Sequence, residues 1–154
     1  MVPARLLLVP YLVVLGLFVF MPGSDVQPVG GALVWAADML SSLGVPFDAA
    51  YAFVEFTANI VLFVPLGLLL SLAGWHLPFW AIVLIGLVST CVIEAVQLAI
   101  PGRYSTLSDV VANTLGTALG ALAARWIGAV RERRSASSDR DRSRVRDTDV
   151  TRNS

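Results

Sequence analysis

Four apolar stretches of helical length dominate residues 1–130 and limit what the chain can fold into. A helix needs about 20 mostly apolar residues to cross a lipid bilayer. The stretches cover residues 4–21, 49–73, 79–100 and 106–127. They predict an all-α, polytopic membrane protein with four transmembrane helices, whose first partner is the lipid bilayer.

The composition favours a membrane protein over a soluble domain. Charged residues make up 14% of the chain and hydrophobic residues 56%, with a mean hydropathy of +0.76. Soluble domains carry about 25% charged residues. The single cysteine, Cys91, excludes an intrachain disulfide. We expect no nucleic-acid partner.

The first apolar stretch has two interpretations. A signal peptide would have the same basic residue, Arg5, and the same kind of apolar core. However, no small-x-small cleavage site follows at once, because residues 22–25 read PGSD. The sequence therefore favours a first transmembrane helix, near the lower limit of length for a span.

Residues 22–50 form a mixed segment with three aspartates and no basic residue. Within it, apolar residues recur at helical spacing between Leu33 and Leu43, and Asp38 lies on the opposite face. This pattern predicts a short amphipathic helix on the membrane surface in the first outer loop, with Trp35 at the level of the lipid headgroups. An ordinary loop that packs on the helix bundle is the alternative.

Charge is divided unevenly along the chain. Residues 1–124 carry a net charge of −4 and residues 125–154 a net charge of +4, the latter from nine Arg and five acidic residues. Cytoplasmic flanks of membrane helices are rich in basic residues, so we expect both termini of this multi-pass protein of the cell membrane to be cytoplasmic. Residues 131–154 have almost no apolar side chain, which predicts a disordered, Arg-rich tail after a membrane domain of residues 1–130.

Seven polar side chains interrupt the apolar stretches or the turn between the last two, and the predicted topology places them all near the outer membrane face. Polar and charged groups are costly in a bilayer, so they indicate a site or a network that compensates for this cost. In each of the last three stretches, the two polar residues are three or four positions apart and share a helix face. The candidate ligand-binding residues are Glu55, Asn59, Glu94, Gln97, Arg103, Asp109 and Asn113.

Several of these side chains also have a structural interpretation. Asp109 completes a capping box with Thr106, and Asn59 and Asn113 suit hydrogen bonds between helices. Arg103 could hold an anion such as phosphate or carboxylate, contact lipid headgroups or pair with an acidic side chain. A ligand site and a structural polar network therefore remain two interpretations of the same residues.

The order of these motifs resembles that of VanZ-like membrane proteins over about residues 53–120. The matching pieces are Glu55-x-x-x-Asn59 before Leu62-Phe63-Val64-Pro65-Leu66-Gly67, then Glu94-x-x-Gln97, Pro101-Gly102-Arg103 and Ser108-Asp109-x-x-x-Asn113-x-x-Gly116. The resemblance implies a small multi-span protein linked to the cell envelope or to glycopeptide (teicoplanin) tolerance. The Arg-rich tail lies outside it.

Three functions fit the sequence. The first is the binding or modification of an anionic or lipid-linked wall molecule at the outer face. The second is transport, which needs polar groups across the whole bilayer. The third is a structural membrane module that packs with a partner through the small-residue face of Gly116 and Gly120. The chain has no Ser-His-Asp set, no His/Cys cluster and no P-loop, so we expect neither metal nor cofactor, and the sequence leans against an enzyme.

Overall fold

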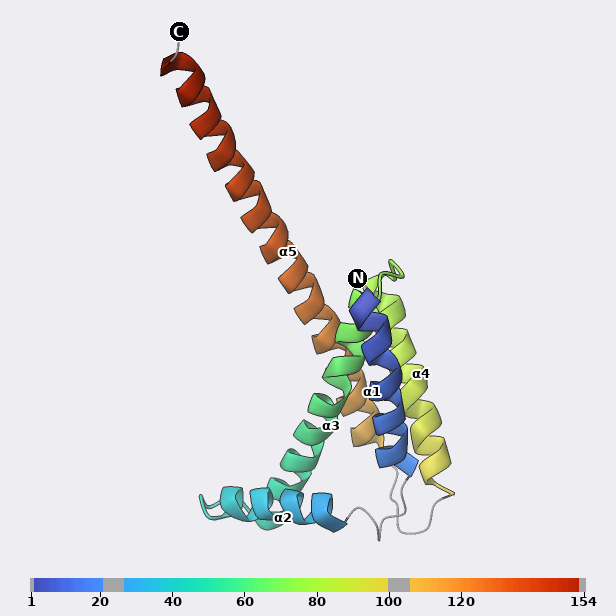
Figure 1. The fold of residues 1–154 in the computed structure, drawn as a ribbon. Helices are drawn as coiled ribbons and strands as arrows, with labels where there is room; N and C mark the ends of the chain where they lie inside the picture. The colour runs from blue at the N-terminus through green and yellow to red at the C-terminus, as the bar shows by residue number, and fades with distance from the viewer. Residues whose placement is uncertain (1, 21–26, 100–105, 153–154) are drawn as a thin grey trace.

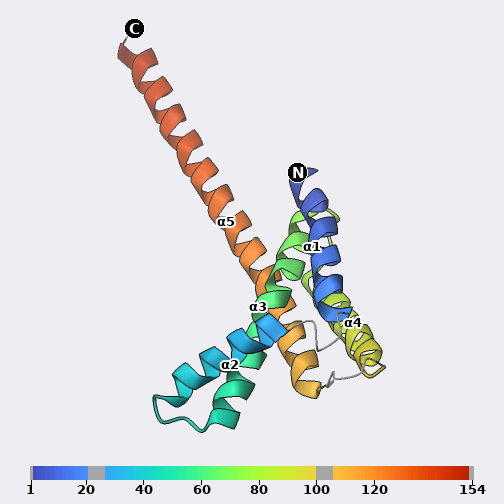
Figure 2. The same cartoon turned by 60° about the horizontal axis from the view of Figure 1, so that its bottom comes forward.

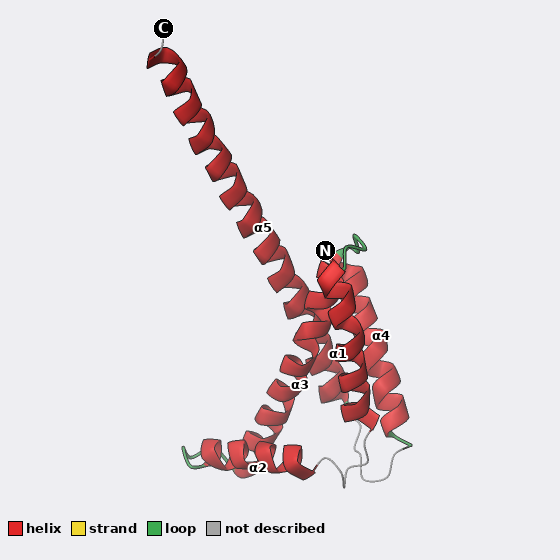
Figure 3. Ribbon diagram, in the orientation of Figure 1, coloured by secondary structure: helices red, strands yellow, loops and turns green. Residues whose placement is uncertain are grey.

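The structure is a computed structural model that describes residues 2–20, 27–99 and 106–152, with side chains for residues 4–17, 30–99 and 106–135. The described regular structure is entirely helical (Figure 3), which confirms the predicted all-α class. The helices are α1 (Val2–Phe20), α2 (Gln27–Ser41), α3 (Phe47–Leu72), α4 (Phe79–Gln97) and α5 (Leu107–Arg152).

Among the described residues, three helices are long and apolar enough to cross a membrane, which makes the chain a multi-pass membrane protein. They are α3, α4 and the part of α5 from Leu107 to Ser135, while the apolar part of α1 covers Ala4–Leu17. The fourth span, at α1, stays a prediction. Figure 1 shows α2 beside the first turns of α3 at one end of the bundle, and the start of α1 and the α3–α4 turn at the other. We call these the α2 end and the turn end.

α2 lies where the sequence predicts a helix between the first two apolar stretches. It runs across the end of the bundle, crosswise to α1 and α4 (Figure 1), and packs on α3. Ala37 is fully buried, whereas Trp35 is exposed. The position of this helix on a membrane surface stays a prediction.

α5 continues without a break to Arg152 and projects away from the other helices (Figures 1 and 2). This differs from the disordered tail that we expected from residue 131 onward. Residues 131–152 contain neither Pro nor Gly, so nothing in the sequence ends the helix, although they carry too few apolar side chains to join a core. The division of the chain into two domains at residue 130 stays a prediction.

Glycines let α5 approach α3 closely. A Cβ atom on Gly116 would overlap the carbonyl oxygen of Ile60, and one on Gly120 would overlap that of Val64. The predicted small-residue face is thus covered by α3 of the same chain. The structural-module hypothesis requires this face to be open to a partner, and it is not.

A second contact joins three helices at Thr117, which is fully buried on α5. Gly67 of α3 lies against the backbone of Thr117, and Gly86 of α4 lies against its side chain. A Cβ atom at either glycine would overlap Thr117. The core of the bundle therefore depends on small residues from α3, α4 and α5, which is typical of helix packing in lipid.

α1 is held on the bundle by apolar contacts and by one hydrogen bond. Leu8 and Leu15 are buried in the apolar core, and the Tyr11 hydroxyl donates to the carbonyl oxygen of Leu62 at 2.9 Å. This carbonyl lies in the turn before Pro65, where the missing N–H of proline interrupts the hydrogen bonds of α3. Tyr11 therefore contacts α3 within the turn that Pro65 interrupts.

Tyr11→Phe is expected to lower the free energy of unfolding by about 1 kcal/mol, the usual net value of one hydrogen bond. Thermal unfolding of the purified protein in detergent measures the change. Tyr51→Phe is the matched control, because the described residues offer no hydrogen-bond partner to the Tyr51 hydroxyl, whose ring packs at 6.2 Å from that of Phe47. Equal effects of the two changes would contradict a role for the bond to Leu62.

Candidate functional site

Asp109 joins the start of α5 to α3. Its Oδ1 atom accepts a hydrogen bond from Asn59 Nδ2 at 2.6 Å. The Thr106 hydroxyl donates to Oδ2 at 2.8 Å and accepts from the backbone N–H of Asp109 at 3.2 Å. The Thr106 half of the predicted capping box is therefore present, and the Asp109 carboxylate, which contacts the Thr106 hydroxyl, also joins two candidate site residues across helices.

Glu55 lies one turn before Asn59 on α3, with its side chain exposed. It is near enough to Asp109 for the two carboxylate charges to repel. Two neighbouring carboxylates concentrate negative charge, which a cation or a hydrogen-bond donor would stabilise. This part of the site is therefore suited to groups that donate hydrogen bonds.

A row of buried polar side chains lies between α4 and α5. Thr90 is fully buried, and Asn113 and Glu94 are 3% and 7% exposed. Asn113 Nδ2 donates to the Thr90 hydroxyl oxygen at 2.9 Å. Since α4 and α5 run in opposite directions (Figure 1), Glu94, one turn beyond Thr90, lies toward the start of α5. The row thus leads from the core of the bundle toward Asp109.

The Asn113 amide has a partner at one end only. With Nδ2 donating to Thr90, the Oδ1 atom is buried and has no hydrogen-bond partner within the described part of the chain. Leaving a buried acceptor unpaired costs roughly 1–3 kcal/mol. A ligand that offers an N–H or O–H group at this position would remove that cost, so Oδ1 is the atom of the site that points most directly to a ligand.

Gln97 lies in the last turn of α4, three residues after Glu94, and is half-buried. Arg103 lies outside the described residues, so its role stays a prediction. Among the side chains that the structure places, no group of three His, Cys, Asp or Glu residues could hold a metal ion. The described part of the site therefore offers carboxylates and amides.

Thr90 is the site residue that sequence reasoning missed. A threonine in a membrane helix often donates to a carbonyl of its own helix, as Thr57 and Thr114 do here, and therefore gives no signal of a contact between helices. The useful signal is the spacing Gly86-x-x-x-Thr90-x-x-x-Glu94, which puts a gap, a hydroxyl and a carboxyl on one face of α4.

Comparison with known proteins extends the resemblance beyond the short motifs. A family model described as VanZ/LLP1 matches residues 8–128, from α1 into α5. This match covers most of the chain and all of the candidate site residues. No curated protein and no solved structure gives a significant match. The chain therefore belongs to the VanZ/LLP1 family.

Proposed function

We propose that this protein binds the polar head of a lipid-linked wall molecule at the outer face of the cell membrane. The observation that carries the proposal is the buried Oδ1 atom of Asn113, which lacks a donor among the described residues. The buried Glu94 on the facing helix, and Glu55 and Asp109 nearer the α2 end, support it. Together they form a polar path into an otherwise apolar bundle.

The charges of the described residues support an outward-facing α2 end. Arg5 contacts the α3–α4 turn, and Arg125 lies over Phe79 in the first turn of α4, so both basic residues are at the turn end. Glu55 and Asp109 lie toward the other end of their helices. Because basic residues favour the cytoplasmic side, four spans with both termini in the cytoplasm place the proposed site outside.

The chemistry of the site indicates the class of ligand. Carboxylates and the Asn113 oxygen accept hydrogen bonds, which suits sugar hydroxyls and peptide N–H groups. Arg103, in the predicted outer turn, would hold a phosphate or carboxylate through its forked donors. A polyprenyl diphosphate that carries a sugar and a peptide offers all of these groups on one lipid.

We propose binding rather than bond cleavage. The chain contains one histidine, His76, which lies in the α3–α4 turn, whereas Asp109 lies in the first turn of α5 at the opposite end of the bundle (Figure 1). Histidine, the commonest general base in enzymes, is thus remote from the site. A protein that binds a wall precursor would change the amount that is accessible to a glycopeptide antibiotic, which connects binding to glycopeptide tolerance.

The double variant Thr90→Val/Asn113→Leu provides the sharpest test. Replacing both partners of a buried hydrogen bond by apolar groups of similar shape leaves stability nearly unchanged, so we expect a melting temperature close to wild type. We also expect at least tenfold weaker binding of a polyprenyl-diphosphate-linked disaccharide peptide in nanodiscs. Binding that survives this change would remove Asn113 from the site.

Glu94→Gln and Arg103→Gln extend the test to the charged residues. Both variants are expected to keep the melting temperature of wild type, to lose binding of the same probe, and to abolish any wild-type effect on the teicoplanin sensitivity of cells. If instead both variants melt several degrees lower and wild type does not bind the probe, the polar residues form a structural network and the proposed function is wrong.

A further inference from the structure

A second charged feature lies at the turn end, which the proposed function does not use. The turn after α3 contains Gly74 and His76 with left-handed backbone, at φ +74° and +50°. Between them, the Trp75 side chain is 48% exposed. This tight turn therefore presents a tryptophan at the end of the bundle, where the aromatic residues of membrane proteins meet lipid headgroups.

Arg5 of α1 reaches this turn and is fixed there by two contacts. Its Nε donates to the carbonyl oxygen of Ala73 at 2.6 Å, and its Cζ lies 5.9 Å from the ring centroid of Trp75. A guanidinium group has five N–H donors, and the bond to Ala73 uses one of them. The four N–H groups on the two Nη atoms have no acceptor among the residues that the structure describes.

We propose that Arg5 and Trp75 bind the phosphate group of an anionic membrane lipid. Two parallel Nη–H groups match the geometry of two phosphate oxygens. The bond to Ala73 and the contact with Trp75 already fix the guanidinium, so less side-chain freedom is lost on binding. The exposed apolar side chains Leu6 and Val9, next along α1, lie where the acyl chains of such a lipid would run.

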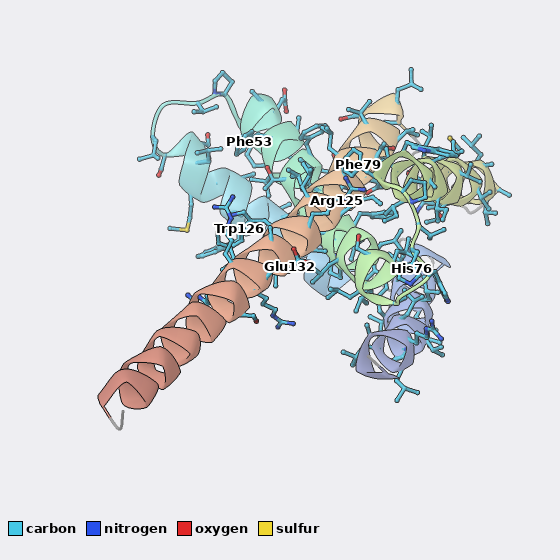
Figure 4. The ribbon with its side chains drawn as sticks, turned by 90° about the horizontal axis from the view of Figure 1, so that it is seen from above. Phe53, His76, Phe79, Arg125, Trp126 and Glu132 are labelled. Carbon is cyan, nitrogen blue, oxygen red and sulfur yellow. The ribbon has the colours of Figure 1, made fainter. Side chains whose placement is uncertain are left out.

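The surrounding charges favour an anionic lipid over a zwitterionic one. Phe79 is the first residue of α4, just after the same turn. The guanidinium of Arg125 lies 5.2 Å from the centroid of the Phe79 ring. Figure 4 looks onto this end and shows His76 on the turn and Arg125 beside Phe79. Arg131 and Arg133 follow along α5 and are exposed. This positive end attracts negative headgroups, and it is separate from the carboxylates near the α2 end.

Quenching of Trp75 fluorescence by brominated lipid tests this site directly. The full-length chain, with Trp35, Trp80 and Trp126 replaced by Phe, is reconstituted in phosphatidylcholine vesicles that contain brominated phosphatidylglycerol or the same fraction of brominated phosphatidylcholine. We expect at least threefold stronger quenching by the anionic lipid. Arg5→Gln is expected to abolish this preference. Arg5→Lys keeps the charge but loses the two parallel N–H donors of the guanidinium, so it is expected to reduce the preference.

Arg133→Gln is the matched control, because it removes the same charge from an exposed residue that does not contact Trp75. It should leave the preference intact. Equal quenching by the two lipids in wild type, or equal loss in the Arg5→Gln and Arg133→Gln variants, would overturn the site. Displacement of the brominated lipid by millimolar inorganic phosphate would also overturn it, since the ligand would then be soluble phosphate. Circular dichroism of each variant checks that the helices form, and Arg5→Lys keeps the test decisive if Arg5→Gln does not fold.

Discussion

Gly120→Ala is expected to lower the free energy of unfolding by about 3 kcal/mol, the upper part of the usual range for overpacking. A Cβ atom on Gly120 would overlap the carbonyl oxygen of Val64 and lie 2.8 Å from the backbone nitrogen of Leu68. These are backbone atoms of α3, which cannot rotate away as a side chain could. The two helices must therefore separate, and thermal unfolding in detergent measures the loss.

The control for this change is Gly128→Ala on the same helix, where an added Cβ meets no atom within 4 Å. Alanine favours a helix over glycine by up to about 1 kcal/mol, so the control is expected to be neutral or stabilising. If both substitutions had the same effect, the close crossing of α3 and α5 would not exist in the folded protein.

Asp109→Ala is expected to lower the free energy of unfolding by about 2–4 kcal/mol. It removes the negative charge in the first turn of α5, worth about 0.3–1 kcal/mol, and the charged hydrogen bond from Asn59, worth about 1.5–3 kcal/mol. Denaturant or thermal unfolding of the purified protein measures the change. Asp48→Ala is the matched control, because Asp48 is an exposed acid in the first turn of α3 and that helix start has no side-chain cap.

A double-mutant cycle separates the two contacts of Asp109. Asn59→Ala removes only the bond between helices, so its effect and that of Asp109→Ala should add to more than the effect of the double variant. Strict additivity would mean that the 2.6 Å contact between Asn59 and Asp109 contributes nothing to stability. The part of the Asp109 effect that remains in an Asn59→Ala background reports the contact of the carboxylate with the Thr106 hydroxyl and its charge at the start of α5.

The apolar pattern predicted the membrane helices well. α3 begins at Phe47 and α4 at Phe79, against predicted starts at residues 49 and 79, because proline and polar turn residues set sharp limits to the apolar runs. α5 is the exception. Its composition after residue 130 predicts that it cannot join a core. However, a helix that is already formed in the bundle can extend residue by residue through a segment without a breaking residue, and that segment has none.

The candidate site could be predicted only in part. Spacing of three or four residues places polar side chains on one helix face, and topology places them at one end, but neither indicates which helix faces which. The sequence identifies Asn113 as a candidate because it is a polar residue in an apolar stretch. Its hydrogen bond with Thr90, in contrast, depends on the register between α4 and α5. That register follows from the contact of Gly86 with Thr117, and a single glycine in an apolar run reveals no partner.

Because α5 is one continuous helix, a tilt at one end also moves the other end. Its 46 residues span about 69 Å at a rise of about 1.5 Å per residue, and its tightest crossing with α3 lies at Gly116 and Gly120. Along the helix axis, Asp109 is about 14 Å from this crossing and Arg152 is about 51 Å from it in the opposite direction. A tilt that moves Asp109 by about 1 Å therefore moves the far tip by about 4 Å, so a small displacement at one end is amplified at the other.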